Sequence, residues 1–236
     1  KKKKKLAKFL LEVFAKNCPV KCLNNTGGNT AHMPELNFIL PNWFEKINDA
    51  QLDGLVNDGF IVLDDCFDVK FFQALQKESG LIDYQAANLT QGERITSIRG
   101  DSTRWIDEHC PIGMQYLQAI NELAQFFNQT LYTGIRRSEA HYARYPAGFG
   151  YQWHSDNPQG RDERVLSAVF YLNEGWGAHD GGEIVVIDQN DTQQQLQPQG
   201  NRLVIFNSNL VHQVAITHRE RFSIATWMRK DGLISQ

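Results

Sequence analysis

The chain has 236 residues, of which 42% are hydrophobic and 22% are charged, which is ordinary for a globular protein. Its formal net charge of −3 gives no global reason to expect binding to nucleic acid or to a membrane. No apolar run approaches the roughly 18 residues that a membrane-spanning helix needs, and the length suits one domain with a sizeable core.

Cysteine is sparse in this chain, and the four residues are Cys18, Cys22, Cys66 and Cys110. A disulfide framework is therefore not expected. Cys18 and Cys22 have a loose metal-ligand spacing with His32 downstream, but no second cysteine pair follows. Reduced thiols are favoured over a zinc site, and they predict a cytoplasmic protein.

Residues 1–35 are expected to form a basic, amphipathic N-terminal extension, and residues 36–236 the main domain. Lysines fill positions 1–5 and 8, and apolar residues from Leu6 to Phe14 recur at helical spacing. Such a helix can bind a membrane surface, nucleic acid or a partner. A solvated helix packed on its own domain is the favoured interpretation. The turn-forming segment 24–29 marks the boundary.

Three helices are predicted in the first half of the main domain, over residues 41–58, 69–78 and 111–130. Each carries apolar residues at helical spacing, and Gly59 and Gly80 end the first two. A short apolar strand over 60–63 separates these two helices. The polar segment 88–101 is expected to be a strand, a loop and a second strand.

The second half of the domain is predicted to be mostly β-structure. Strands are expected at 138–145, 164–172, 183–187, 202–206 and 221–227. Gly181 and Gly182 form a turn, since glycine permits a positive φ. The Gln- and Asn-rich segment 189–199 is interpreted as an exposed hairpin end. Strands with regular turns predict a sandwich or a barrel.

Three possible metal ligands, His154, Asp156 and His212, occur in this half. His154 and Asp156 are two residues apart, so on a strand their side chains would point to the same face. His212 follows a distant strand. Two imidazoles and one carboxylate leave about half of the positions of octahedral iron open, the arrangement of non-haem Fe(II) oxygenases. The spacing does not exclude zinc, which favours a tetrahedral site with one open position.

Arg221 strengthens this interpretation, because His-x-Asp alone is short and frequent and a lone histidine is more often structural. Arg221 lies nine residues after His212 and opens an apolar strand. A charge buried without a partner is very costly, so this arginine needs a carboxylate. The planar guanidinium binds a carboxylate through two parallel hydrogen bonds. Arg221 is therefore predicted to anchor an acidic cosubstrate.

The combination of His-x-Asp, a distal histidine and a following arginine resembles the Fe(II)- and 2-oxoglutarate-dependent dioxygenases. Within them the chain is most similar to the prolyl 4-hydroxylases, closest to the hypoxia-inducible-factor-type enzymes and their bacterial relatives. Further matching stretches are Ile-Arg-Gly-Asp at 98–101, Tyr-Pro with a Gly-rich turn at 145–150, His-Ser-Asp-Asn-Pro at 154–158 and Tyr-Leu-Asn at 171–173. The resemblance implies a mixed α/β fold with a mainly β core, a double-stranded β-helix (jelly roll) supported by N-terminal α-helices.

The resemblance also implies a role for particular residues in the domain 36–236. Fe(II) would be bound by His154, Asp156 and His212. The cosubstrate 2-oxoglutarate would contact Arg221, Tyr145, Tyr171, Ile184 and Val214. The substrate would contact Arg99, Asp101, Arg164 and Trp227. Ascorbate is a candidate accessory reductant. No catalytic residue is implied beyond the metal ligands, and no general acid or base is required. Core packing is the alternative role of the two tyrosines and of Trp227.

The implied activity is hydroxylation of a prolyl residue in a protein or peptide, with dioxygen consumed and 2-oxoglutarate converted to succinate and CO2. Asp156 favours hydroxylation, since related halogenases carry glycine there. One alternative is a dioxygenase for a free amino acid or another small molecule. A nucleic-acid demethylase is less favoured, because no broad basic stripe surrounds the motif. A non-catalytic binding or sensor module is disfavoured because all three ligands and Arg221 are present.

Overall fold

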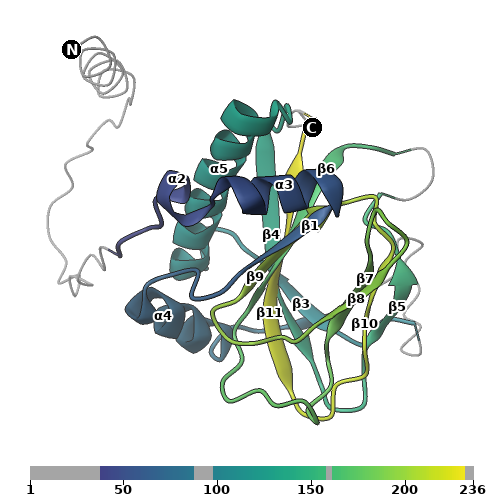
Figure 1. Ribbon diagram of the computed structural model, residues 1–236. Coiled ribbons are helices and arrows are strands. Elements are labelled where there is room, and N and C mark those ends of the chain that lie inside the picture. The colour runs from purple at the N-terminus through teal and green to yellow at the C-terminus, as the bar shows by residue number, and fades with distance from the viewer. Residues whose placement is uncertain (1–37, 88–97, 158–160, 232–236) are drawn as a thin grey trace, which may run out of the picture. The chain divides into compact units, whose positions relative to one another are not determined.

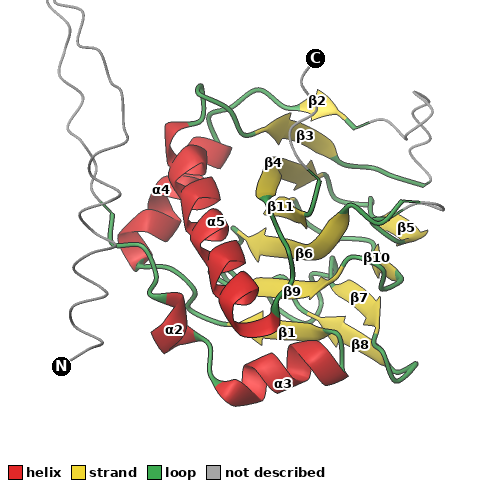
Figure 2. Cartoon of the chain, turned by 90° about the horizontal axis from the view of Figure 1, so that it is seen from above, coloured by secondary structure: helices red, strands yellow, loops and turns green. Residues whose placement is uncertain are grey.

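The computed structural model describes residues 38–87, 98–157 and 161–231. The predicted extension 1–35 and most of the polar segment 88–101 lie outside the described residues, so the division at residue 35 stays a prediction. Two antiparallel sheets pack against each other, and the helices cover the outer face of the larger sheet (Figures 1 and 2). This arrangement confirms the predicted jelly roll with supporting helices.

The larger sheet has seven strands in the order β1-β9-β6-β11-β4-β3-β2. Their bounds are β1 Phe60–Leu63, β2 Gln85–Ala86, β3 Ser102–Trp105, β4 Arg137–Tyr145, β6 Arg164–Tyr171, β9 Leu203–Asn207 and β11 Arg221–Arg229. The central strand β11 pairs with β4 along its whole length and with β6 on its other side. This register places Arg221 directly opposite Tyr145.

The smaller sheet has four strands in the order β5-β10-β7-β8. Their bounds are β5 Tyr151–His154, β7 Ile184–Ile187, β8 Gln193–Leu196 and β10 His212–Val214. The β5–β10 register sets His212 opposite His154. Apolar side chains from both sheets fill part of the space between them, namely Tyr171, Ile184, Val186, Val204 and Phe206.

Four helices are described, α2 Trp43–Lys46, α3 Asp49–Asn57, α4 Val69–Ser79 and α5 Pro111–Leu131. The longest helix, α5, starts with Pro111. Proline suits this position because a backbone N–H in the first turn has no hydrogen-bond partner within the helix. One stripe of α5 is buried in the main core, including Tyr116, Ile120, Leu123 and Phe127. Within the described residues, no helix combines the length and the apolar character needed to cross a membrane.

A buried carboxylate ties these helices to the larger sheet. Glu78, near the end of α4, accepts hydrogen bonds from the backbone N–H groups of Ile112 and Gly113 at 2.8 and 2.7 Å. It also accepts one from the hydroxyl of Tyr142 on β4 at 2.7 Å. The N-terminus of α5 favours negative charge, so Glu78 fixes α4, α5 and β4 relative to one another.

Most predicted elements are confirmed with their ends shifted by no more than two residues, and two need correction. The predicted helix 41–58 is two helices, because Asn48 and Gln51 form a capping box that starts α3 and leaves Ile47 extended. The segment 189–199 is more than a hairpin end, since it contains β8, which pairs with β7. Near the polar segment 88–101, the described strands are β2 and β3.

Candidate active site

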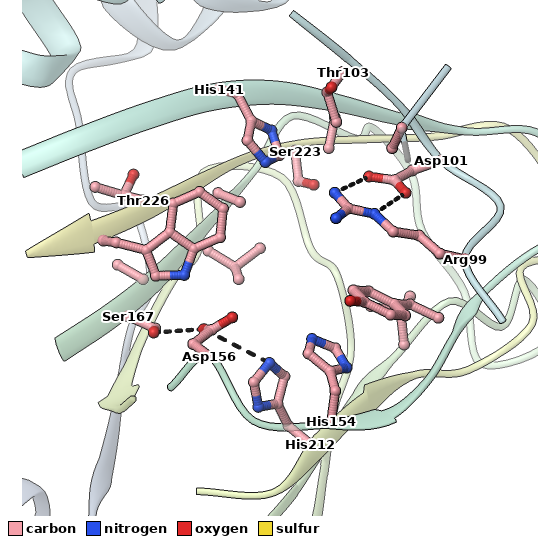
Figure 3. A pocket seen from close by; sticks show the side chains of 18 of the residues that line it. Arg99, Asp101, Thr103, His141, His154, Asp156, Ser167, His212, Ser223 and Thr226 are labelled. Atoms are coloured by element: carbon pink, nitrogen blue, oxygen red, sulfur yellow. Dashed lines mark hydrogen bonds and ion pairs between the residues drawn. The ribbon is translucent and has the colours of Figure 1, made fainter. Parts of the chain in front are cut away.

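A cavity of about 790 Å³ is lined by residues of both sheets (Figure 3). Every predicted site residue except Tyr171 lines it, and the Tyr171 ring centroid lies 5.0 Å from the guanidinium carbon of Arg221 in the lining. These residues come from β4, β5, β6, β7, β10 and β11 and from the segments next to them. The fold thus gathers side chains that are far apart in the sequence into one chamber.

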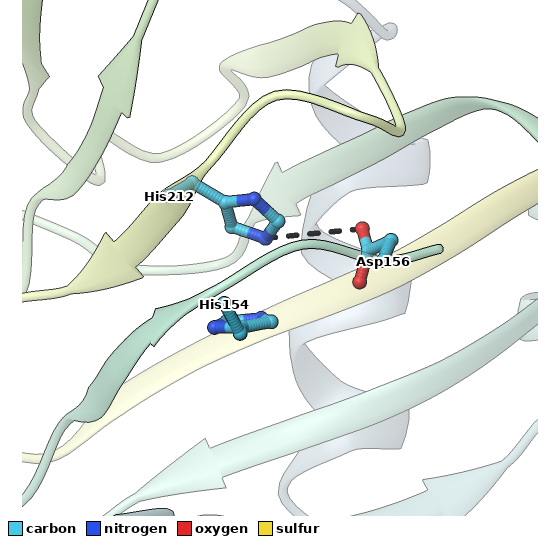
Figure 4. A group of neighbouring side chains, drawn as sticks. All are labelled: His154, Asp156 and His212. Carbon is cyan, nitrogen blue, oxygen red and sulfur yellow. Dashed lines mark ion pairs between the residues drawn. The ribbon is translucent and has the colours of Figure 1, made fainter. Parts of the chain in front are cut away.

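His154, Asp156 and His212 form a compact cluster in this cavity (Figure 4). One ligand atom from each lies within 4.8 Å of the other two, and the part of the chain that the structure describes holds no other such cluster. His212 Nε2 is 3.8 Å from Asp156 Oδ2. The donor set, two imidazoles and one carboxylate, matches that of non-haem iron sites.

Strand alternation does not bring His154 and Asp156 together, contrary to the prediction. Strand β5 ends at His154, and the chain bends through Asp156. The backbone N–H of Asp156 donates to the carbonyl oxygen of Ser208 at 3.1 Å. Asp156 therefore enters the cluster from a bend that is attached to the turn after β9.

Backbone carbonyls orient both imidazoles. Nδ1 of His154 lies 2.7 Å from the carbonyl oxygen of Gln152, and Nδ1 of His212 lies 2.9 Å from that of Leu210. A carbonyl oxygen only accepts, so each Nδ1 carries the proton and each Nε2 keeps its lone pair for a metal. Burial, reinforced by His212, lowers the pKa of His154 to about 4 against the opposing effect of Asp156. His154 is therefore neutral at pH 7, as a ligand must be.

The Asp156 carboxylate stays ionised although it is buried. Burial alone would raise its pKa, but His212 and a hydrogen bond from Ser167 outweigh burial and lower that pKa. The Ser167 hydroxyl lies 2.6 Å from Asp156 Oδ2. The cluster thus offers one carboxylate and two imidazoles as metal ligands.

Arg221 lies in the same cavity and is 1% exposed, among the largest fully buried side chains. Its Nε donates to the carbonyl oxygen of Gly182 at 2.9 Å, and its Nη1 donates to Ser223 Oγ at 3.2 Å. The guanidinium carbon lies 5.1 and 5.0 Å from the ring centroids of Tyr145 and Tyr171. None of the ion pairs among the described residues involves Arg221, so the carboxylate partner expected for it is not supplied there.

The predicted Gly181-Gly182 turn serves this arginine. Gly182 has φ +72°, and a Cβ there would sit 3.0 Å from Arg221 Cδ. Glycine lets the turn's carbonyl approach the guanidinium closely. A side chain at this position would push Arg221 out of place.

Two tyrosines flank the Arg221 guanidinium. Burial raises the pKa of Tyr171, an effect that the positive charge of Arg221 opposes, and burial likewise raises the pKa of Tyr145. Both phenols are therefore neutral hydroxyl donors at pH 7. The buried hydroxyl of Tyr171 has no hydrogen-bond partner among the described residues. A buried hydroxyl without a partner is unfavourable, so this end of the cavity has unused donor capacity.

The Arg99–Asp101 pair lies on another wall of the cavity (Figure 3). Arg99 Nε and Nη2 donate to the two carboxylate oxygens of Asp101 at 2.7 and 3.0 Å. The Arg99 guanidinium carbon also lies 5.0 Å from the Tyr151 ring centroid. Tyr151 in turn stacks on His154 with a centroid distance of 3.7 Å. The pair is thus connected to the metal cluster through one aromatic ring.

Arg164 and Trp227 are stacked, with the guanidinium carbon 4.0 Å from the indole centroid. Arg164 Nη1 donates to the backbone carbonyl oxygen of Asp156 at 3.1 Å, and Nη2 lies 3.6 Å from Glu139 Oε1. Trp227 and Arg221 both line the cavity from β11, as the strand spacing predicts. The predicted substrate residues therefore adjoin the metal cluster.

Sequence reasoning missed four residues that shape the cavity or its cluster, His141, Trp105, Ser167 and Ser208. The His141 ring lies 5.1 Å from the Trp105 ring and 5.2 Å from the Trp227 ring, and burial lowers its pKa to about 4. His141 and Tyr145 are four residues apart on β4, so their side chains point to the same face, and this spacing could have identified His141 from the sequence. Ser167, the one serine in the largely apolar strand 164–172, was another available signal.

Comparison with known proteins agrees with this geometry. Residues 140–229 match the 2OG-Fe(II) oxygenase superfamily. Prolyl hydroxylase EGLN3 of Mus musculus is 30% identical over 209 residues, which cover 81% of this chain and 82% of that protein. Egl nine homolog 1 of Homo sapiens is 29% identical over 187 residues, covering 72% of this chain and 43% of that protein.

Solved structures show the same similarity. A Pseudomonas putida prolyl-4-hydroxylase has a TM-score of 0.71 at 33% sequence identity, covering 77% of this chain and 98% of that one. A prolyl hydroxylase from Trichoplax adhaerens, in complex with a hypoxia inducible factor oxygen degradation domain peptide fragment, has a TM-score of 0.73 at 23% identity. That alignment covers 83% of this chain and 98% of the other, and it shows the shared fold.

The fold and the cavity define an Fe(II)- and 2-oxoglutarate-dependent dioxygenase. The chain belongs to the prolyl hydroxylase family of these enzymes. Membership resolves the choice between iron and zinc that the ligand spacing left open, in favour of Fe(II). It also makes the protein an enzyme rather than a non-catalytic module.

Proposed function

We propose that this enzyme hydroxylates a prolyl residue of a peptide or protein, with Fe(II) on His154, Asp156 and His212 and 2-oxoglutarate on Arg221. The observation that carries the proposal is the buried guanidinium of Arg221, which has no carboxylate partner among the described residues and shares a cavity with the metal cluster. An uncompensated buried charge is very costly. An acid that enters the cavity would compensate it.

Three protein ligands leave coordination positions open for the cosubstrate and dioxygen. When bound, Fe(II) and 2-oxoglutarate supply oxidising chemistry that consumes dioxygen, yields succinate and CO2 and converts a substrate C–H bond into C–OH. The chain contributes the geometry. The carbonyl oxygens of Gln152 and Leu210 hold the imidazoles with Nε2 toward the cluster.

The cosubstrate end supplies charge, hydroxyl donors and apolar walls. The fork of Arg221 would pair with the far carboxylate of 2-oxoglutarate. Tyr145 and Tyr171 would donate their hydroxyls to oxygens of the bound acid, which accounts for the unpartnered Tyr171 hydroxyl. Ile184 and Val214, which line the cavity, would contact the methylene groups.

The substrate end favours a prolyl ring within a chain. Trp227 offers an aromatic face, and Arg164 and the Arg99–Asp101 pair offer charged groups that can bind peptide carbonyl and amide groups. The names of the relatives describe prolyl hydroxylases, and the Trichoplax adhaerens structure contains a peptide. The free thiols of Cys66 and Cys110 support a cytoplasmic setting.

The test is turnover with Fe(II), 2-oxoglutarate and ascorbate on a library of proline-containing peptides and, separately, on free L-proline. We expect succinate formation to rise with particular peptides, and those peptides to gain the mass of one oxygen atom. Succinate that rises with free L-proline and with no peptide would favour a small-molecule dioxygenase. Succinate that never exceeds the level given by the Asp156→Ala variant would contradict the proposal altogether.

A further inference from the structure

Two buried serines stand behind the carboxylate of the metal cluster. Ser167 on β6 is 2% exposed and Ser208 after β9 is fully buried. Ser167 Oγ lies 2.6 Å from Asp156 Oδ2 and 2.8 Å from Ser208 Oγ. The contact between the two hydroxyls is buried, and the contact of Ser167 with Asp156 is part-buried at the wall of the cavity. Hydrogen bonds in such surroundings are costly to lose.

The direction of these hydrogen bonds follows from the charge of Asp156. An ionised carboxylate only accepts, so Ser167 must donate its single proton to Asp156. Ser208 must then donate to Ser167. The result is a one-way relay from Ser208 through Ser167 to Oδ2, and its last link is a short charge-assisted hydrogen bond.

A cationic group competes for the same carboxylate. Arg164 Nη1 lies 3.9 Å from Asp156 Oδ1, beyond hydrogen-bond distance. The same nitrogen already donates to the backbone carbonyl oxygen of Asp156 at 3.1 Å. Arg164 and Asp156 thus already form a loose ion pair. A small rotation of the carboxylate would shorten it to a direct charge-assisted hydrogen bond, which would occupy an oxygen that a metal needs.

The turn that carries Ser208 also orients the second ligand strand. The carbonyl oxygen of Ser208 accepts from the Asp156 backbone N–H at 3.1 Å, and the carbonyl oxygen of Leu210 lies 2.9 Å from His212 Nδ1. One turn, 207–210, thus positions a carboxylate ligand and a histidine ligand together. Within the turn, the backbone N–H of Leu210 donates a hydrogen bond to the carbonyl oxygen of Asn207 at 2.9 Å.

We propose that Ser167, supported by Ser208, is a positioning residue that holds the Asp156 carboxylate for the metal and away from Arg164. The inference rests on the assignment of Asp156 as a metal ligand. It goes beyond that assignment, because it makes Arg164 a competitor of the metal for the Asp156 carboxylate. The hydroxyls of Ser167 and Ser208 would prevent this competition.

Metal affinity, measured without turnover, tests this role. Mn(II) binding to the apoprotein is followed by calorimetry for the wild type and for Ser167→Ala, Ser208→Ala and Ser138→Ala. Loss of a residue that orients a ligand typically costs 10–100-fold in metal affinity, and we expect roughly that for Ser167→Ala. Ser208→Ala should lose less, because Asp156 keeps its own hydrogen bond. Ser138→Ala is the matched control, since the Ser138 hydroxyl is buried without a partner.

The competing role of Arg164 is tested by introducing Arg164→Gln into the wild type and into the Ser167→Ala variant. Removing a nearby cation should raise Mn(II) affinity slightly in the wild type. In Ser167→Ala it should restore most of the lost affinity, a coupling that a purely structural defect would not show. An equal effect of Arg164→Gln in the two backgrounds would overturn the proposal. The comparison uses Ser208→Ala in place of Ser167→Ala if the latter does not fold.

The outcomes separate this inference from the proposed function. Asp156→Ala must abolish Mn(II) binding, and retained binding would mean that the ligand assignment itself is wrong. If Asp156→Ala abolishes binding while Ser167→Ala binds Mn(II) as tightly as the wild type, only the role of Ser167 is refuted.

Discussion

The two ends of the cavity differ in how fully the protein satisfies their polar groups. At the metal end, each ligand is oriented by a partner, namely the carbonyl oxygens of Gln152 and Leu210 and the hydroxyl of Ser167. At the other end, Arg221 contacts neutral oxygens and aromatic faces, and the Tyr171 hydroxyl has no partner among the described residues. The metal end is organised in advance, whereas the cosubstrate end needs an anion.

This difference explains how one cavity can be both rigid and selective. Ligands held by second partners bind a metal without reorganisation. Buried hydrogen-bond donors that have no acceptor in the protein favour binding of a ligand that supplies one. A ligand without acceptors would leave these donors unpaired and would bind more weakly. On the proposed assignment of Arg221, the selectivity for an acidic cosubstrate arises from the polar groups that the fold leaves without partners.

The largest expected effect comes from breaking the metal end. His154→Ala, Asp156→Ala and His212→Ala should each abolish succinate formation with little loss of fold, because we propose that all three bind one ion. Activity is measured at limiting Fe(II), and the melting temperature is measured on the same samples. The control is His109→Ala, an exposed histidine outside the cavity. Near-normal activity in any one of the three variants would show that its residue is not a ligand.

A smaller effect is expected at the substrate end. Trp227→Ala removes the indole that holds Arg164 in place and that would pack on the prolyl ring, and an aromatic contact of this kind contributes about 0.5–1.5 kcal/mol. The Michaelis constant for a peptide substrate should rise by up to roughly tenfold, with the constant for 2-oxoglutarate unchanged. Trp153→Ala is the matched control, because Trp153 is exposed on β5 and does not line the cavity. Equal constants for Trp227→Ala and the wild type would leave Trp227 with a core-packing role.

A further effect, on stability and with no direct effect on substrate binding, concerns pH at His141. Burial lowers its folded-state pKa to about 4, below the ordinary value. The contribution of neutral His141 to stability is therefore complete above about pH 6.5 and is lost as pH falls toward 4. Between pH 7 and 4.5 the apoprotein should lose on the order of 2 kcal/mol more than His141→Phe does.

Urea unfolding of the apoprotein at both pH values provides this comparison, with His109→Gln as the control for an exposed histidine. The acid-induced loss should be unchanged by His109→Gln. A loss of equal size in the wild type and in His141→Phe would mean that His141 is not the group responsible.

The sequence predicted the parts of this site that depend on residue type and order. Arg221 was identified because a charge opening an apolar strand requires a partner, and Gly182 because a turn requires positive φ. The bend at Asp156 was not foreseeable, since it depends on the carbonyl oxygen of Ser208 far along the chain. The break between α2 and α3 was missed because apolar spacing continues through it, although Asn48 and Gln51 have the capping pattern.

Residues that act through others were the hardest to predict. Ser167 and His141 have no motif of their own, and their roles follow from contacts with Asp156, Trp105 and Trp227. Long-range register between β3, β4, β6 and β11 sets Trp105 beside His141 and Ser167 beside Trp227, and the bend after β5 brings Asp156 to Ser167. Spacing within a single strand does not contain that information.

The claim that Arg221 binds the far carboxylate of the cosubstrate is tested most directly with an analogue that lacks this group. Affinities of 2-oxoglutarate and 2-oxobutyrate are measured for the Mn(II)-loaded wild type, Arg221→Lys and Arg221→Ala. Charged hydrogen bonds contribute ~1.5–3 kcal/mol each, so the wild type should prefer 2-oxoglutarate by roughly 10² or more. Arg221→Lys should keep part of that preference, and Arg221→Ala should lose it while binding Mn(II) normally. A preference that survives unchanged in Arg221→Ala would contradict the account.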